Sequence, residues 1–140
     1  MVKLANADIQ LLASFEQTTG ATAFDVLIES EKIVFLVKKE QLGRAIGRQG
    51  ANIERLKRVM GKRVEVIPFS DEVQEFLKSF FKPVEITSAE TRENAEGKKV
   101  IYLKVDQANK GLAIGRGGEK INRARVILKR HFDYADLKIL

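Results

Sequence analysis

Hydrophobic positions in the first half of the chain follow helical spacing in some stretches and strand-like patterns in others. Helical spacing predicts helices over residues 7–18, 41–46 and 51–60. Runs rich in β-branched and aromatic residues predict strands over residues 23–28, 33–37 and 63–68. The polar sequence ESEK separates the first two strands, which is typical of a hairpin. The order is therefore helix, strand, strand, helix, helix, strand.

The second half repeats this order. A helix that carries Val73, Phe76 and Phe80 is expected to begin at Asp71 as its N-cap and to end before Pro83. The later elements are strands over 83–91 and 99–105, a short helix over 108–114, a helix through Ile121 and Leu128, and a strand over 135–140. The predicted fold class is α+β with mixed sheets, in two domains of order α-β-β-α-α-β.

An internal repeat supports the division. When Gly43 is placed over Gly111, an offset of 68 residues, the next 18 residues align without a gap. The identical positions in the first copy are Gly43, Ala45, Ile46, Gly47, Arg48, Gly50, Ile53 and Arg55, which recur as Gly111, Ala113, Ile114, Gly115, Arg116, Gly118, Ile121 and Arg123. The sequence therefore predicts two copies of one small domain, over residues 1–69 and 70–140.

Charge is concentrated in the repeated segments. The chain has 140 residues, 44% of them hydrophobic, and a net charge of +6. Residues 38–63 carry +7 and residues 110–130 carry +6, which leaves −7 for the rest of the chain. Two basic insertions in an acidic scaffold favour a polyanionic partner over a general surface property.

Composition excludes several classes of function. The chain lacks cysteine and has one histidine, His131, so we expect no disulfide, no cofactor and no metal site. No apolar run reaches the length of a membrane span, and the first ten residues lack the apolar core of a signal peptide. We therefore expect a cytoplasmic protein that is not an enzyme and has no contact with membranes.

Each basic segment contains a glycine loop, which consists of Gly47, Arg48, Gln49 and Gly50 in one copy and of Gly115, Arg116, Gly117 and Gly118 in the other. Glycine permits unusual backbone angles and lets a nucleic-acid backbone come close to the main chain. The helix after each loop offers N–H groups and a positive dipole end to phosphate. Neither loop is followed by the G-K-S/T of a P-loop, and neither has the spacing of a dinucleotide fingerprint.

Side chains beside the loops complete the candidate site. Ile46, Ile53, Ile114 and Ile121 are candidates for an apolar floor under the bases, although Ile53 and Ile121 fit an ordinary helix core equally well. Arg44, Arg55 and Arg123 are candidate RNA contacts, as are the less specific Lys57, Arg58 and Arg125, and each is individually also typical of a solvated charge. Neither basic segment has an aromatic residue, so base stacking on aromatic side chains is a poor fit.

The segments AIGRQGANI and AIGRGGEKI resemble the signature of the KH domain, an RNA-binding module. The element order is similar to its type II arrangement, and the tandem pair over residues 5–140 resembles the archaeal NusA-like transcription factors. The resemblance implies that each loop clamps about four nucleotides of single-stranded RNA. It also implies that residues 64–67 and 137–140 border the grooves, that the protein acts in transcription termination or antitermination, and that RNA polymerase or other transcription factors are further candidate partners.

Two alternatives stay open at the level of the sequence. Type II KH domains also occur in ribosome assembly and translation, so the same chemistry would serve a factor there. An enzyme that holds a phosphate substrate in the glycine loops has less support, because no base, metal cluster or nucleophile accompanies either loop. A monomer is the expected state.

Overall fold

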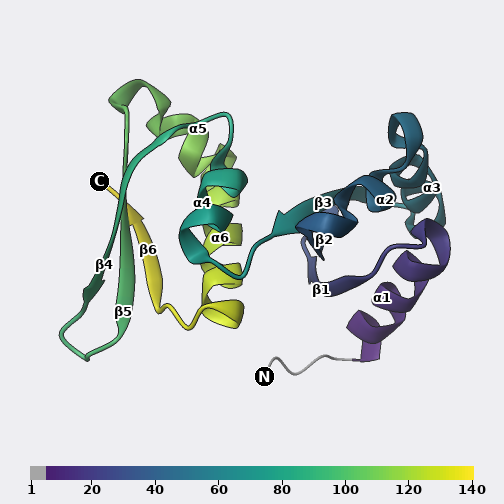
Figure 1. Cartoon of the computed structure of the whole chain (residues 1–140), viewed down its shortest axis with the longest axis horizontal. Coiled ribbons are helices and arrows are strands. Elements are labelled where there is room, and N and C mark those ends of the chain that lie inside the picture. The colour runs from purple at the N-terminus through teal and green to yellow at the C-terminus, as the bar shows by residue number, and fades with distance from the viewer. Residues whose placement is uncertain (1–5) are drawn as a thin grey trace. The chain divides into compact units, whose positions relative to one another are not determined.

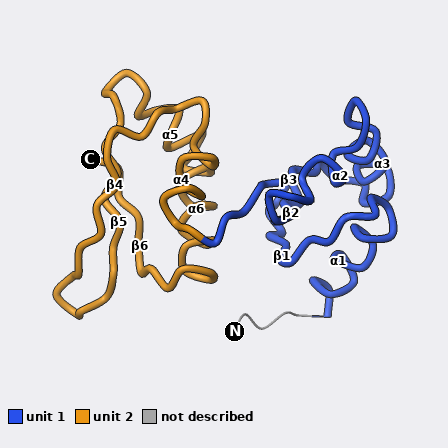
Figure 2. The backbone as a smooth tube through the Cα atoms, viewed as in Figure 1, with its two compact units in different colours: residues 1, 3–71 blue, residues 2, 72–140 orange. Residues whose placement is uncertain are grey.

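The structure, a computed structural model, describes residues 6–140. These residues form two compact units, and the boundary between the units falls between Asp71 and Glu72 in the chain (Figures 1 and 2). The sequence repeat predicts the division two residues earlier. The prediction that the first ten residues are not a signal peptide concerns residues 1–5 in part, and these lie outside the described residues. No helix in the described part of the chain is long and apolar enough to cross a membrane.

The first unit has the predicted element order (Figure 1). Its elements are α1 (Asn6–Thr19), β1 (Ala23–Ile28), β2 (Lys32–Lys38), the 3₁₀ turn η1 (Lys39–Gln41), α2 (Leu42–Ile46), the 3₁₀ turn η2 (Arg48–Gly50), α3 (Ala51–Met60) and β3 (Arg63–Phe69). Strand β2 is the centre of the sheet, antiparallel to β1 and parallel to β3. The predicted helices and strands are confirmed to within one residue at each end.

The second unit repeats the order and the sheet topology. Its elements are α4 (Val73–Phe81), β4 (Ile86–Glu93), β5 (Lys99–Val105), η3 (Gln107–Asn109), α5 (Lys110–Ile114), η4 (Arg116–Gly118), α6 (Glu119–His131) and β6 (Asp136–Ile139).

The second unit differs from the prediction in three places. The short helix expected over 108–114 begins as α5 at Lys110, because residues 107–109 form the 3₁₀ turn η3. The N-cap of α4 is Glu72, in extended conformation and without a side-chain bond to the helix, so the assignment of Asp71 was wrong. Strand β4 begins at Ile86, because the Val84 N–H donates to the Phe81 carbonyl at 2.8 Å and closes a turn where the strand was expected.

The parallel pairing explains where the basic segments lie. Two parallel strands cannot be joined by a tight hairpin and need a crossover of a dozen or more residues. In the first unit the crossover from β2 to β3 contains α2, the glycine loop and α3, which lie within the basic segment 38–63. The crossover from β5 to β6 contains the segment 110–130 in the same way. Each glycine loop thus lies between two helices, in a crossover whose two ends are paired strands of one sheet.

The helices of the first unit pack on one face of its sheet. Phe15 of α1, Phe35 of β2 and Leu56 of α3 are completely buried in one cluster, and the rings of Phe15 and Phe35 are 4.5 Å apart. Ala45 of α2 is also fully buried, so that the short helix before the loop is held against the core. Ala113 of α5 is likewise fully buried in the second unit.

Candidate nucleic-acid interface

The two glycine loops have nearly the same backbone. Gly47 has φ 78° and ψ 171°, and Gly115 has φ 80° and ψ 169°, a region that is essentially restricted to glycine. Each loop closes with a hydrogen bond of 3.1 Å from its fourth residue to its first, from the Gly50 N–H to the Gly47 carbonyl and from the Gly118 N–H to the Gly115 carbonyl. The sequence repeat is therefore also a repeat of loop geometry.

The first glycine of each loop is required by the protein's own packing. A Cβ atom on Gly47 would lie 2.9 Å from the backbone nitrogen of Asn52, and one on Gly115 would lie 2.9 Å from that of Lys120. These distances are too short for real contacts, and the atoms belong to the first turn of the following helix. The first glycine lets the loop fold back tightly on that helix.

The second glycine has an open side. Gly50 and Gly118 both adopt left-handed helical angles, with φ 76°. A Cβ atom on Gly50 would meet no heavy atom within 4 Å, and one on Gly118 would come only to 3.4 Å from the Asn122 side chain. The space beside Gly50 and Gly118 is therefore available to a ligand backbone. The sequence argument expects such space at the first and last glycine of each loop.

The tip of each loop is basic and is followed directly by a helix start. Arg48 and Arg116 are exposed. Helices α3 and α6 begin directly after the loops, and no side chain caps them at their N-terminal residues Gly50 and Gly118. An uncapped helix start carries partial positive charge, so the guanidinium group and the helix end favour the same anionic ligand.

Asn52 and Lys120, which occupy equivalent positions, hold each loop against the rest of its unit. The Asn52 side-chain amide donates to the carbonyls of Arg44 at 2.7 Å and of Thr19 at 3.4 Å. The Lys120 ammonium donates to the carbonyl of Lys82 at 3.5 Å, just after the end of α4. Sequence reasoning missed both residues. The repeat alignment contained only a weak indication of this role, namely that Asn52 and Lys120 occupy equivalent positions and both have side chains that can donate hydrogen bonds.

In the second unit an open groove of about 530 Å³ lies beside the loop. It is lined by Ile114, Gly118, Ile121, Asn122, Arg125, Lys138 and Ile139. The structure thus brings the predicted isoleucines of the floor together with the predicted strand edge. Ile114 is 38% exposed whereas Ile121 is 6% exposed, so Ile121 belongs to the core and to the floor at once.

Arg125 joins helix α6 to strand β6 at the side of this groove. Its Nε donates to the Leu137 carbonyl at 3.1 Å and lies 3.0 Å from a carboxylate oxygen of Asp136, while its Nη1 donates to Asn122 Oδ1 at 2.9 Å. These contacts orient the Asn122 amide. Lys138 belongs to the predicted strand edge, whereas Asn122 lines the groove without having been predicted.

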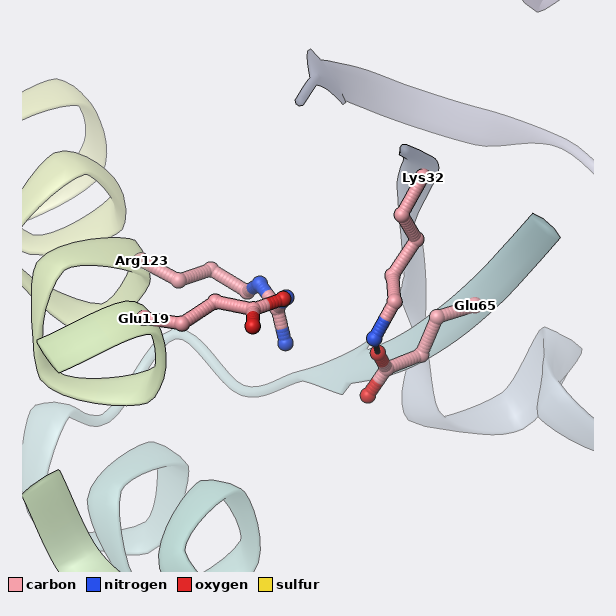
Figure 3. Close-up of polar contacts among 4 residues, drawn as sticks. All are labelled: Lys32, Glu65, Glu119 and Arg123. Atoms are coloured by element: carbon pink, nitrogen blue, oxygen red, sulfur yellow. Dashed lines mark hydrogen bonds and ion pairs between the residues drawn. The ribbon is translucent and has the colours of Figure 1, made fainter. Parts of the chain in front are cut away.

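The other predicted basic residues lie in different settings. Arg44, Arg55 and Arg58 are exposed, and Lys57 pairs with Glu54 at 3.2 Å. Arg123 is instead buried, and its guanidinium donates to Glu119 Oε1 at 3.1 Å (Figure 3). An RNA contact by Arg123 stays a prediction, and this ion pair sets Arg123 apart from its repeat equivalent Arg55.

Two further ion pairs lie on the strands, outside the loops. In the first unit, Lys32 of β2 donates to Glu65 of β3 at 2.9 Å, which links the two parallel strands (Figure 3). On β4, the Arg92 guanidinium donates to the Glu90 carboxylate and lowers the pKa of that group. Among residues 6–140, no three His, Cys, Asp or Glu side chains come together in a group that could hold a metal ion.

Comparisons with known proteins agree with the geometry. The sequence model of the KH domain matches residues 12–96, a stretch that contains the first glycine loop and ends before the second. The probable transcription termination protein NusA of Halococcus morrhuae is 34% identical, over 99% of this chain and 98% of that protein. The protein of the same name from Methanococcus vannielii is 32% identical, over 99% of this chain and 80% of its own.

A solved structure is similar over nearly the whole chain. The crystal structure of APE1850 shares 33% sequence identity with this protein and superimposes with a TM-score of 0.87, covering 98% of this chain and 100% of that one. The chain therefore belongs to the KH-domain family and, within it, to the archaeal NusA-like proteins.

Proposed function

We propose that this protein binds single-stranded RNA through two KH domains, one in each unit, and acts in transcription termination or antitermination. The observation that carries the proposal is the double occurrence of one site. Each unit has a glycine loop with an open side at its second glycine, an exposed arginine at its tip and an uncapped helix start behind it. The names of the NusA relatives support the role in transcription.

The phosphate backbone is the part of RNA that the loops fit. Arg48 and Arg116 provide cationic donors, and the open sides of Gly50 and Gly118 allow the sugar-phosphate chain to approach. Beside the second loop, the groove of about 530 Å³ has a size suited to bases, which turn their apolar faces toward Ile114 and Ile121. The phosphates would then bind at the loops while the bases enter the grooves.

Charge reversal in the loops tests this proposal. The double variants Arg48→Asp/Gln49→Asp and Arg116→Asp/Gly117→Asp each change the net charge by −3 in one loop. Aspartate tolerates the left-handed angles of Gln49 and Gly117, so each unit is expected to fold. Binding of a short single-stranded RNA, measured by fluorescence anisotropy, should fall at least tenfold in each variant. Unchanged affinity in both variants would refute the loop assignment.

A matched control separates loop contacts from overall charge. The double variant Ala95→Asp/Lys98→Asp also changes the net charge by −3, at the exposed turn between β4 and β5, which belongs to neither loop. We expect it to bind RNA nearly as the unaltered protein does. A loss equal to that of the loop variants would mean that the basic charge acts only in a general way.

Salt dependence and strand preference give a second measurement. If about four phosphates are neutralised, the logarithm of the binding constant should fall against the logarithm of salt concentration with a slope of about −3. Duplex RNA of the same length should bind more weakly, because its bases cannot enter the grooves. Equal affinity for single-stranded and duplex RNA would contradict a KH groove.

The cellular role needs a separate experiment. RNAs and proteins that co-purify with the chain from its native cells would distinguish transcription from ribosome assembly. We expect nascent transcripts together with RNA polymerase or transcription factors. Recovery of ribosomal RNA and ribosomal proteins instead would replace the transcription role with one in ribosome assembly or translation, while leaving the RNA-binding chemistry intact.

A further inference from the structure

Both units carry a polar pair at the same place on the helix that follows the loop. In the repeat alignment Glu54 stands over Asn122, and Lys57 stands over Arg125. The Lys57 ammonium lies 3.2 Å from Glu54 Oε1, and Arg125 Nη1 lies 2.9 Å from Asn122 Oδ1. Each pair therefore joins a cationic side chain to an oxygen three residues before it. The two units differ in the hydrogen-bonding group that the first residue of the pair, Glu54 or Asn122, leaves available to a ligand.

In the second unit the pair leaves a hydrogen-bond donor beside the loop. Arginine only donates hydrogen bonds, so the Asn122 atom that faces Arg125 must be the carbonyl oxygen. The amide nitrogen then points the other way and lies 3.4 Å from the position of a Cβ atom on Gly118. Both residues line the groove, with Ile114 and Ile121 as its apolar part. The groove therefore presents N–H donors next to the second glycine.

In the first unit the same position can only accept. Glu54 is exposed, follows Ile53 on α3, and lies four residues after Gly50, as Asn122 follows Ile121 and lies four residues after Gly118. Lysine also only donates, so one carboxylate oxygen faces Lys57 and the other remains an acceptor. The carboxylate also carries a negative charge, which disfavours a carbonyl oxygen brought close to it.

We propose that Glu54 and Asn122 give the RNA sites of the two units different base preferences. This inference rests on the proposed RNA-binding function. An acceptor at Glu54 favours a base edge that carries an amino group, and its negative charge disfavours the two carbonyl oxygens that flank the N3–H of uracil. A donor at Asn122 bonds equally to the carbonyl oxygens of uracil and to the ring nitrogens of adenine, so it lacks the preference that Glu54 has. Adenine has an amino group and no carbonyl, and uracil has two carbonyls and no amino group. The ratio of adenine to uracil affinity is therefore higher in the first unit than in the second.

The experiment measures each groove separately within the full chain. The charge-reversed loop of one unit silences it, and the affinities of the other unit for short oligo(A) and oligo(U) RNAs are measured. In those backgrounds, Glu54→Gln converts the acceptor into an amide, and Asn122→Asp converts the amide into a carboxylate. Both substitutions preserve the shape of the side chain and its contact with Lys57 or Arg125.

The readout is the ratio of the affinities for oligo(A) and oligo(U), which cancels any effect common to both RNAs. We expect Glu54→Gln to lower this ratio about tenfold and Asn122→Asp to raise it about tenfold, each equivalent to ~1.4 kcal/mol. The matched controls are Glu40→Gln and Gln107→Glu, which make the same charge changes at exposed residues outside the loops. In the controls both affinities should shift together and the ratio should stay constant.

The outcomes separate this inference from the proposed function. If the single-groove proteins bind RNA but both substitutions leave the ratio within twofold of its starting value, Glu54 and Asn122 do not select bases and the inference is wrong. The same holds if the substitutions behave like their charge controls. If the unaltered protein binds neither RNA, the proposed function itself fails. Far-UV circular dichroism of each variant verifies that the fold is retained.

Discussion

Gly115, the first residue of the second loop, should contribute far more to stability than Gly118, its last residue, although the two look alike in the sequence. The perturbation is Gly115→Ala, compared with Gly118→Ala. A Cβ atom on Gly115 would lie 2.8 Å from the Cβ and 2.9 Å from the backbone nitrogen of Lys120. Because these atoms belong to the start of α6, they cannot move without displacing the helix.

The magnitudes follow from the backbone angles and the contacts. At Gly115, alanine adds backbone strain of about 1–3 kcal/mol and overpacking of about 1–3 kcal/mol. The lower entropy of the unfolded chain offsets about 0.4–1 kcal/mol of this cost. The net loss is about 3 kcal/mol. At Gly118, left-handed strain of about 1–2 kcal/mol with the same offset and no close contact gives a loss of about 1 kcal/mol.

The assay uses tyrosine fluorescence during urea unfolding. The chain has two tyrosines, Tyr102 and Tyr134, and no tryptophan, and both tyrosines lie in the second unit. The signal therefore reports the unfolding of the unit that contains the substitution. A unit of this size has a stability of roughly 3–10 kcal/mol, so a loss of about 3 kcal/mol moves the midpoint strongly. Equal losses for the two variants, or a larger loss for Gly118→Ala, would refute the packing argument.

Three further predictions concern other parts of the chain. Gln49→Gly should raise stability by about 0.5 kcal/mol in far-UV circular dichroism melts, because Gln49 has φ 53° and glycine adopts that angle without strain; a loss of stability would contradict this. Leu56→Ala should cost about 2–5 kcal/mol by the same measurement, since Leu56 is completely buried, and a loss below 1 kcal/mol would argue against its place in the core. The pKa of Glu90, followed by NMR, should lie below that of a free glutamate because Arg92 donates a hydrogen bond to it and adds positive charge, and Arg92→Ala should return it to the ordinary value. Because the pKa of Glu90 is lowered, any stabilisation by this pair is present above the ordinary glutamate pKa and is lost as the pH falls through the lowered value. If Arg92→Ala left the pKa of Glu90 unchanged, Arg92 would not be the cause of the shift.

Local pattern was sufficient for most of the fold. The alternation of Val64 and Val66 with charged residues predicts the last strand of the first unit, and the spacing of Ile53, Leu56 and Met60 predicts helix α3. Such patterns arise because a strand or helix must turn one side to a core, and they are written in neighbouring residues. The error at Asp71 concerns the chain just before α4, and the error at the start of β4 concerns the turn between Phe81 and Ile86. Neither stretch has a periodic pattern of hydrophobic residues.

The candidate site likewise has features that the sequence predicts and features that it does not. The sequence alone predicts two glycine loops, each basic and each between two helices, because these features repeat at a fixed offset of 68 residues. It did not distinguish Gly115 from Gly118, since that difference depends on which atoms of α6 approach the loop.

The contacts of the surrounding side chains follow from the packing of the elements and could not be read from the sequence pattern. This packing placed Asn122 beside Gly118 and joined Arg125 to Leu137 of β6, and it paired Arg123 with Glu119 although its equivalent Arg55 is exposed. The physical reason is that hydrogen-bond partners and open space depend on distances between elements. A sequence pattern records which side of its own helix or strand a residue occupies, and packing determines what that side meets.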